Sequence, residues 1–136
     1  MNLKINHLQH VGIPVTDIES SEKFYQRLGF ENVMTSTFAH EGGEGRVMMM
    51  QHGTIIVELY QMPEPTLTEI RNRANGKIDH IAFDVDDIDE TFATLKANGF
   101  RVVEEAPVYL GFWKNGCKYI NILGPNDERL EFCQIL

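Results

Sequence analysis

The chain contains an internal repeat. Residues 10–18 align without a gap with residues 80–88, and the alignment continues through the next helix and strand. A repeat of this length means that one supersecondary unit occurs twice and that each half is a copy of the other. Identical residues are far more frequent than the roughly one or two that chance allows over such a stretch. The identical pairs are His10/His80, Val15/Val85, Asp17/Asp87, Ile18/Ile88, Gly29/Gly99, Phe30/Phe100 and Val33/Val103.

Both halves show the same succession of secondary-structure signals. A strand over residues 8–15 or 78–85 leads to an aspartate suited to a helix N-cap, Asp17 or Asp87. An apolar pattern of helical spacing follows over residues 19–28 and 89–98, and each ends at a glycine suited to a left-handed C-cap. The order predicted is βαβββ, twice. The remaining strands are predicted over residues 30–38, 46–51, 54–61, 100–109, 118–123 and 129–135.

The 136 residues are enough for one ordinary domain built from two half-size modules. We expect a single domain over residues 1–136, with module one at 5–62, a linker at 63–76 and module two at 77–136. Two prolines, at 63 and 65, break the strand that precedes the linker, and one or two helical turns are predicted over residues 66–74, before Asn75-Gly76.

Charge and hydropathy exclude several classes of partner. Twenty acidic residues against twelve basic ones give a net charge of -8, which argues against nucleic acid or an anionic membrane surface as a partner. No apolar run approaches the roughly 18 residues that span a bilayer. The first ten residues also lack the pattern of a secretory signal. The sequence therefore predicts a cytoplasmic protein.

Strand parity identifies the candidate site, because side chains alternate between the two faces of a sheet. Apolar residues alternate with His10 and form the face beneath the helix, so His10 points to the opposite face. The same alternation places His80 on that face in the repeat, and Glu58 and Glu131 in the last strand of each half. Two imidazoles and two carboxylates are therefore predicted to face one cavity. The apolar residues of the first strands are Val11, Ile13 and Val15, and Ile81, Phe83 and Val85.

This set of side chains is typical of a metal site. Two imidazoles with two carboxylates suit Ni²⁺, Co²⁺, Zn²⁺, Mn²⁺ or Fe²⁺, whereas calcium sites use oxygen ligands alone. Buried carboxylates are also costly unless a cation neutralises them. We therefore predict one divalent metal ion bound by His10, Glu58, His80 and Glu131, with two octahedral positions left for water or substrate.

The paired βαβββ modules and these four residues resemble the vicinal oxygen chelate superfamily of glyoxalase I, methylmalonyl-CoA epimerase, extradiol dioxygenases and fosfomycin- or bleomycin-resistance proteins. The resemblance covers nearly the whole chain. It implies an α+β fold in which eight strands form a cupped mixed sheet around a metal, usually within a homodimer. A fold does not fix a function, so the ligand set must discriminate among the members.

The ligand set is most similar to that of bacterial glyoxalase I. Extradiol dioxygenases and fosfomycin enzymes have no ligand at the fourth-strand position, and the epimerases carry glutamine there, whereas this chain has Glu58. The resemblance implies a nickel, cobalt or zinc lyase or isomerase that moves a proton next to a carbonyl through a metal-stabilised enediolate. The linker and residues 77–88 resemble the epimerases as much, so a methylmalonyl-CoA epimerase-like or other 2-epimerase is the alternative. A non-catalytic binding or resistance protein is the second alternative.

Roles follow from the same resemblance. Glu131 is the expected proton-transferring base, and Glu58 is its symmetric alternative. The epimerases use a further glutamate near the third strand, for which Glu44, or Glu41, in the predicted loop around Gly42-Gly43-Glu44-Gly45 is the candidate. Arg46 and Lys118 are the basic residues expected to approach an anionic part of the substrate. The expected substrate is a small carbonyl compound, either a thiol adduct or an acyl-CoA.

Overall fold

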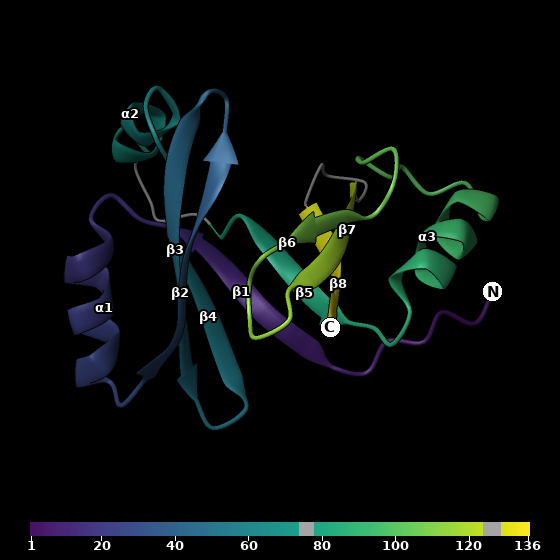
Figure 1. Cartoon of the computed structure of the whole chain (residues 1–136), viewed down its shortest axis with the longest axis horizontal. Helices are drawn as coiled ribbons and strands as arrows, with labels where there is room; N and C mark the ends of the chain where they lie inside the picture. Colours follow the sequence, from purple (N-terminus) through teal and green to yellow (C-terminus); the bar gives the residue numbers. More distant parts are fainter. Residues whose placement is uncertain (74–77, 124–128) are drawn as a thin grey trace. The chain divides into compact units, whose positions relative to one another are not determined.

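The structure is a computed structural model that describes residues 1–73, 78–123 and 129–136. The chain divides into two compact units, coloured along the sequence in Figure 1. The first unit comprises His10–Asp79. The second comprises Met1–Gln9 and His80–Leu136. The N-terminal segment belongs to the second unit because the backbone N–H of Asn6 donates to the carbonyl of Asp84, and the N–H of Asp84 donates to the carbonyl of His7.

Each unit has the predicted βαβββ order. In the first unit the strand order is β2-β3-β4-β1, and in the second it is β5-β8-β7-β6. The first strand of each unit pairs parallel with the last, and the other pairs are antiparallel, so both sheets are mixed. The predicted α+β class with two repeats is therefore confirmed. The elements are β1 (Leu8–Pro14), α1 (Ile18–Arg27), β2 (Glu31–His40), β3 (Gly43–His52), β4 (Ile55–Gln61), α2 (Thr66–Arg71), β5 (His80–Asp84), α3 (Ile88–Ala97), β6 (Val108–Leu110), β7 (Cys117–Leu123) and β8 (Arg129–Ile135).

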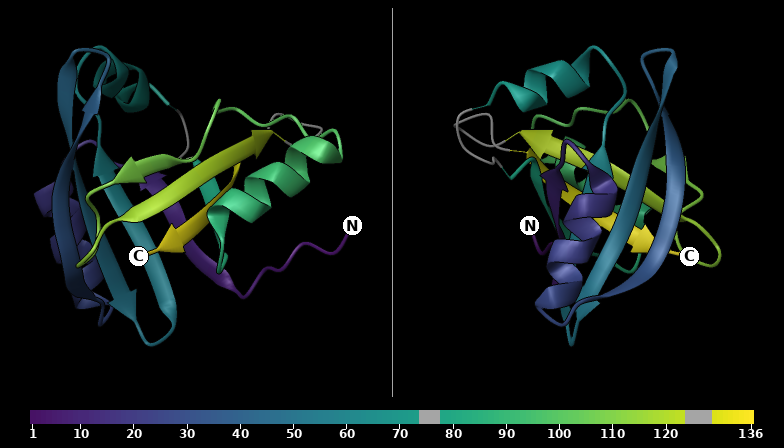
Figure 2. Two further views of the ribbon diagram at one scale, coloured as in Figure 1. Left: turned by 45° about the vertical axis from the view of Figure 1, so that its right-hand side comes forward. Right: turned by 90° about the vertical axis from the view of Figure 1, so that its left-hand side faces the viewer.

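One helix covers one face of each sheet. Helix α1 contacts β2, β3 and β4, and α3 contacts β7 and β8; Figure 2 shows α3 lying along these two strands. The buried apolar side chains beneath the helices form two separate cores. The first core consists of Ile18, Met48, Met50, Val57 and Leu59, and the second of Val85, Ile88, Leu95, Ile120, Ile122 and Phe132.

The helix boundaries agree with the predicted caps. The Asp17 carboxylate accepts the backbone N–H of Ser20, and the Asp87 carboxylate accepts that of Glu90, both at 2.9 Å. Gly29 and Gly99, which follow the helix ends, have φ values of 88° and 76°. This left-handed conformation strains any residue that carries a Cβ, which explains the glycine at both positions.

A glutamine links each helix start to the last strand of its own unit. The backbone N–H of Ile18 donates to Oε1 of Gln61 at 2.9 Å, and the N–H of Ile88 donates to Oε1 of Gln134 at 3.1 Å. Each N–H is one of the groups that a helix leaves without an internal partner. The strand that carries Glu58 or Glu131 is therefore tied to the helix on its other face.

Two predicted elements were wrong. The strand predicted over residues 100–109 is mostly irregular, with one isolated bridge at Val102 and only β6 near its end. The Glu104 carboxylate accepts the backbone N–H of Asn121, so a side chain takes the place of a ladder bond, and Pro107 has no N–H to give. The four-residue loop predicted at 42–45 is a two-residue turn at Glu41 and Gly42, both with positive φ.

The helical turns predicted within the linker are present, whereas the linker boundaries stay a prediction. Helix α2 supplies the expected helical turns, while the predicted break at Asn75-Gly76 lies outside the described residues. In the described part of the chain, every helix is too short or too polar to cross a membrane.

Candidate functional site

The first unit brings His10 and Glu58 together. Strand β1 runs parallel to β4 with Gly12 opposite Glu58. Because His10 lies two residues before Gly12, its side chain is on the same face of the sheet as Glu58. His10 Nε2 lies 3.1 Å from Glu58 Oε2. The side chains are 2% and 12% exposed, which makes this a buried pair.

The second unit repeats this arrangement with His80 and Glu131. Strand β5 runs parallel to β8 with Ala82 opposite Glu131, the position that Gly12 occupies in the first unit. His80 Nε2 lies 3.6 Å from Glu131 Oε2, and the side chains are 8% and 13% exposed. Small residues stand opposite both glutamates, which leaves room for the carboxylates on this face.

The pairs lie on the sheet face that was predicted from strand parity. Met48 and Met50 of β3 and Ile120 and Ile122 of β7 pack under the helices, so the alternate residues of each sheet, the glutamates included, point to the opposite face. We call this the glutamate face of each unit. The structure thus joins each predicted histidine to the predicted glutamate of its own unit.

The donor chemistry of each pair fits a divalent transition metal. A neutral imidazole nitrogen and a carboxylate oxygen are the ligands that Zn²⁺, Ni²⁺ and Co²⁺ accept together. A carboxylate that is only about one-eighth exposed needs a positive partner, and an imidazole supplies one only when it is protonated. A bound cation would satisfy both side chains of a pair at neutral pH.

The polar residues Asn121, Glu104 and Tyr119, close to Glu131, were not predicted from the sequence. Asn121 of β7 pairs directly with Glu131 of β8, and the Glu104 carboxylate accepts two hydrogen bonds from Asn121. Tyr119 shares this face; burial, with the charges of Glu104 and Glu131, raises the pKa of its phenol. The repeat carried a signal for this cluster, because the equivalent positions of the first unit hold Met34 and Met49.

The predicted substrate-binding residues lie elsewhere. Arg46 forms an ion pair with Glu19, and Lys118 lies 3.3 Å from Asp89, so each pairs with the first turn of its own unit's helix. Both therefore lie on the helix side of their sheets. Glu44 is exposed at the start of β3. A role for these three residues in substrate binding stays a prediction.

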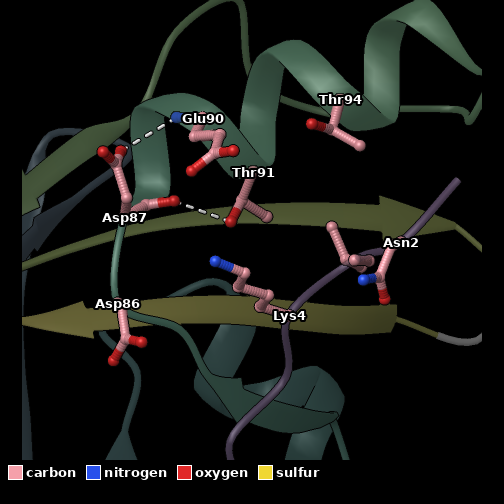
Figure 3. Close-up of a pocket in the computed structure, with 8 residues that line it drawn as sticks. Asn2, Lys4, Asp86, Asp87, Glu90, Thr91 and Thr94 are labelled. Atoms are coloured by element: carbon pink, nitrogen blue, oxygen red, sulfur yellow. Dashed lines mark hydrogen bonds between the residues drawn. The ribbon is translucent and has the colours of Figure 1, made fainter.

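A surface pocket lies at the start of α3 (Figure 3), away from the glutamate face. The Asp87 carboxylate is engaged by the N–H of Glu90, and its carbonyl accepts the hydroxyl of Thr91 at 2.7 Å. These bonds cap the helix, so Asp87 and Thr91 are engaged in the structure of the helix start. Its lining residues are Asn2, Leu3, Lys4, Asp86, Asp87, Glu90, Thr91 and Thr94.

Residues 9–120 match the family described as the Glyoxalase/Bleomycin resistance protein/Dioxygenase superfamily. The chain belongs to this superfamily. The resemblance to vicinal oxygen chelate proteins, which rested on the repeat and on His10, Glu58, His80 and Glu131, is thereby confirmed. The superfamily contains enzymes of several classes, so membership alone leaves the reaction open.

Individual relatives span most of the chain. The uncharacterized protein YwkD of Bacillus subtilis (strain 168) is 30% identical over 105 residues, which cover 76% of this chain and 78% of that protein. The methylmalonyl-CoA epimerase of Mycobacterium tuberculosis is similar in structure, with a TM-score of 0.78 and 20% identity over 97% of this chain and 89% of the epimerase. A variant of the Streptomyces coelicolor methylmalonyl-CoA epimerase in complex with 2-nitronate-propionyl-CoA has a TM-score of 0.76 and 22% identity, over 96% and 98% of the two chains. At these identities the epimerases are similar in fold alone.

Proposed function

We propose that this superfamily member is a metal-dependent lyase or isomerase of the glyoxalase I type. It would move a proton next to a carbonyl group of a small substrate through an enediolate. The observation that carries the proposal is the buried histidine–glutamate pair that occurs once in each unit, on the face away from the helix. A chain that needed these positions only for packing would have no reason to keep four ionisable side chains there.

His10, Glu58, His80 and Glu131 would together hold one divalent ion, with nickel, cobalt and zinc as the candidates. When bound, the ion supplies Lewis-acid stabilisation of the negative charge on a substrate oxygen, a contribution of several kcal/mol. The imidazoles and carboxylates of the chain fix the position of that charge. The four side chains are at most 13% exposed, and electrostatic stabilisation is stronger at such a position than in bulk water.

Glu131 is the proposed proton-transferring base. It lies 3.6 Å from His80 Nε2 in the pair of the second unit. The resemblance of the ligand set to that of bacterial glyoxalase I supports Glu131 for this role. Glu58 remains the symmetric alternative for this role.

The test is an assay of the nickel-, cobalt- and zinc-loaded protein with the hemithioacetal of methylglyoxal and glutathione. Glu131→Gln should lower kcat by at least about 100-fold, because a positioned general base contributes roughly that much or more. Glu58→Gln should lower kcat less, and Glu31→Gln, at an exposed position of β2, should leave it unchanged. Metal content is measured for every variant. Absence of turnover with all three metals would contradict the lyase.

A 2-epimerase is the second candidate function, acting on an acyl-CoA or on an α-hydroxy carbonyl compound. The structural likeness to methylmalonyl-CoA epimerases, one of them in complex with an acyl-CoA compound, supports it. Both reactions begin with removal of a proton next to a carbonyl. Incorporation of solvent deuterium into such a substrate without net conversion would favour the epimerase over the lyase.

Three further expectations accompany the proposal. A non-catalytic binding or resistance protein would leave the metal unneeded, so a purified protein without metal and without a thermal shift on adding divalent ions would favour that alternative. We expect a homodimer, which sedimentation equilibrium would detect. We also expect a cytoplasmic location, which cell fractionation would test.

A further inference from the structure

The glutamate faces of the two units differ next to the carboxylates. In the first unit Met49 pairs with Glu58 across β3 and β4, and Met34 pairs with Met49 from β2. In the second unit Asn121 pairs with Glu131, and Glu104 contacts Asn121 from the other side. One copy of the repeat thus fills these positions with an apolar pair, and the other copy fills them with a polar pair.

The orientation of the Asn121 amide is fixed by its partner. Its backbone N–H donates to Glu104 Oε2 at 2.6 Å, and its side-chain Nδ2 donates to Glu104 Oε1 at 2.8 Å. A carboxylate only accepts hydrogen bonds, so the NH₂ group must face Glu104 and the amide oxygen must point away from it.

The amide oxygen of Asn121, which points away from Glu104, is a buried acceptor. Asn121 is 5% exposed, and its Oδ1 has no hydrogen-bond donor among the residues that the structure describes. Leaving such an acceptor without a donor is unfavourable, and most buried polar atoms in proteins are satisfied. The first unit accommodates Met49 at the equivalent place, so the fold itself does not require an asparagine there.

The surroundings favour a ligand that donates a hydrogen bond. Glu104 and Glu131 are both acceptors when ionised, and they flank Asn121 on either side. The cation on the same face of β8, Arg129, is exposed at the start of the strand. A substrate hydroxyl can donate to Asn121 Oδ1, whereas a substrate carboxylate has no hydrogen to donate and would also meet the charge of Glu104.

We propose that Asn121 Oδ1 is a specificity-determining acceptor that binds a hydroxyl group of the substrate beside Glu131. The inference rests on the proposed function, because it takes Glu131 to lie at the reacting carbon. It names the substrate class as 2-hydroxy carbonyl compounds, in preference to 2-carboxyacyl thioesters. Glu104 is then a positioning residue, since it holds the amide so that the oxygen faces the ligand.

The experiment compares two probes that differ by one hydroxyl: the 2-hydroxypropionyl and propionyl thioesters of N-acetylcysteamine. Dissociation constants are measured by NMR titration of the metal-loaded protein. The wild type should bind the hydroxylated probe at least about tenfold more tightly, because the unhydroxylated probe leaves the acceptor unsatisfied. Asn121→Leu, which has a similar volume and no acceptor, should reduce that ratio to within about twofold of one.

Two variants control for packing. The double variant Glu104→Met/Asn121→Met copies the apolar pair of the first unit and should also lose the preference while staying folded. Met49→Leu, at the equivalent place beside Glu58, should keep the full preference. A wild type that binds both probes equally or binds neither, or an Asn121→Leu variant that keeps the preference, would overturn the inference. Hydrogen–deuterium exchange at the probe carbon tests the proposed function separately, because it reports proton removal whichever probe binds more tightly.

Discussion

Asp17 shows how one side chain couples helix stability to pH. Its carboxylate accepts the backbone N–H of Ser20, and this bond holds the pKa of Asp17 below its ordinary value of 3.8. A carboxyl group with a lowered pKa stabilises the folded state above its unfolded pKa, and this stabilisation disappears as the pH falls through the folded value. The cap on α1 should therefore be complete near neutral pH and weaken below about pH 4.

This coupling predicts a pH-dependent difference in Tm between the wild type and Asp17→Ala. The wild type should melt at a higher temperature at pH 6, and the difference should shrink as the pH falls from 4 toward 3. Asp17→Asn is the matched control, because it keeps a capping oxygen that does not titrate. Its advantage over Asp17→Ala should stay constant with pH. A wild-type advantage that grows in acid would contradict the assignment.

Individual residues of the candidate site were predictable to the extent that they follow strand parity. His10, Glu58, His80 and Glu131 sit in regular strands, so their faces follow from their positions in the sequence. Glu104 lies in irregular backbone, where alternation gives no direction. Its contact with Asn121 could be found only from the structure, although the replacement of Met34 and Met49 in the repeat marked the place.

Among the secondary-structure elements, helices α1 and α3 end in the same way but in different surroundings. Gly29 and Gly99 both adopt a left-handed conformation after the last helical turn. A Cβ on Gly29 would lie 3.3 Å from the His52 ring, whereas a Cβ on Gly99 would have no neighbour within 4 Å among the residues that the structure describes. Gly29 and Gly99 therefore form a matched pair. A Cβ would strain the backbone at both positions, but it would crowd a neighbouring side chain at Gly29 alone of the two.

Gly99→Ala should lower the free energy of unfolding by about 1–2 kcal/mol, the cost of placing a Cβ in the left-handed region. Gly29→Ala should lower it further, because the His52 ring must also move. Urea denaturation of both variants measures the two changes. The His52→Ala substitution removes the ring. In a double-mutant cycle, Gly29→Ala should therefore lower the free energy of unfolding less in the His52→Ala background than in the wild type. Equal losses for the two single variants would contradict the crowding argument.

The boundaries of regular elements were predicted well, and the departures have local causes. Helices α1 and α3 and strand β8 agree with their predicted ranges to within about one residue, because caps and alternation mark them. The strand predicted over residues 100–109 failed because a carboxylate from Glu104 takes a backbone N–H of the neighbouring strand. The hydropathy pattern of a sequence does not reveal where a side chain replaces a backbone hydrogen bond between strands.

At the scale of the whole molecule, metal binding should stabilise the folded chain. A metal that binds the native protein and not the unfolded chain raises the free energy of unfolding by about 2.7 kcal/mol when its free concentration is 100 times Kd. We expect Tm to rise on adding nickel, cobalt or zinc and to return on adding EDTA. His10→Ala and His80→Ala should each remove most of the shift, whereas His7→Ala, an exposed histidine, should retain it. A shift that survives both site variants would place the metal elsewhere.

The fold of the whole molecule was predictable because the repeat specified one unit and then its copy. The substrate was not predictable, since the four predicted ligand residues indicate at most a class of proton-transfer chemistry and leave the rest of the substrate undefined. The proposed specificity residue, Asn121, lies where the two copies differ, since Met49 occupies the equivalent position in the first unit.

The glutamine links of Gln61 and Gln134 have an evolutionary consequence. Each one joins a helix to the strand that carries a glutamate by a bond within a single copy of the repeat. Tandem fusion of one ancestral gene therefore doubles the number of correctly placed carboxylates in one genetic event, with no new contact to invent. Point mutations on the neighbouring strands then distinguish the copies, as Met49 beside Glu58 and Asn121 beside Glu131 show.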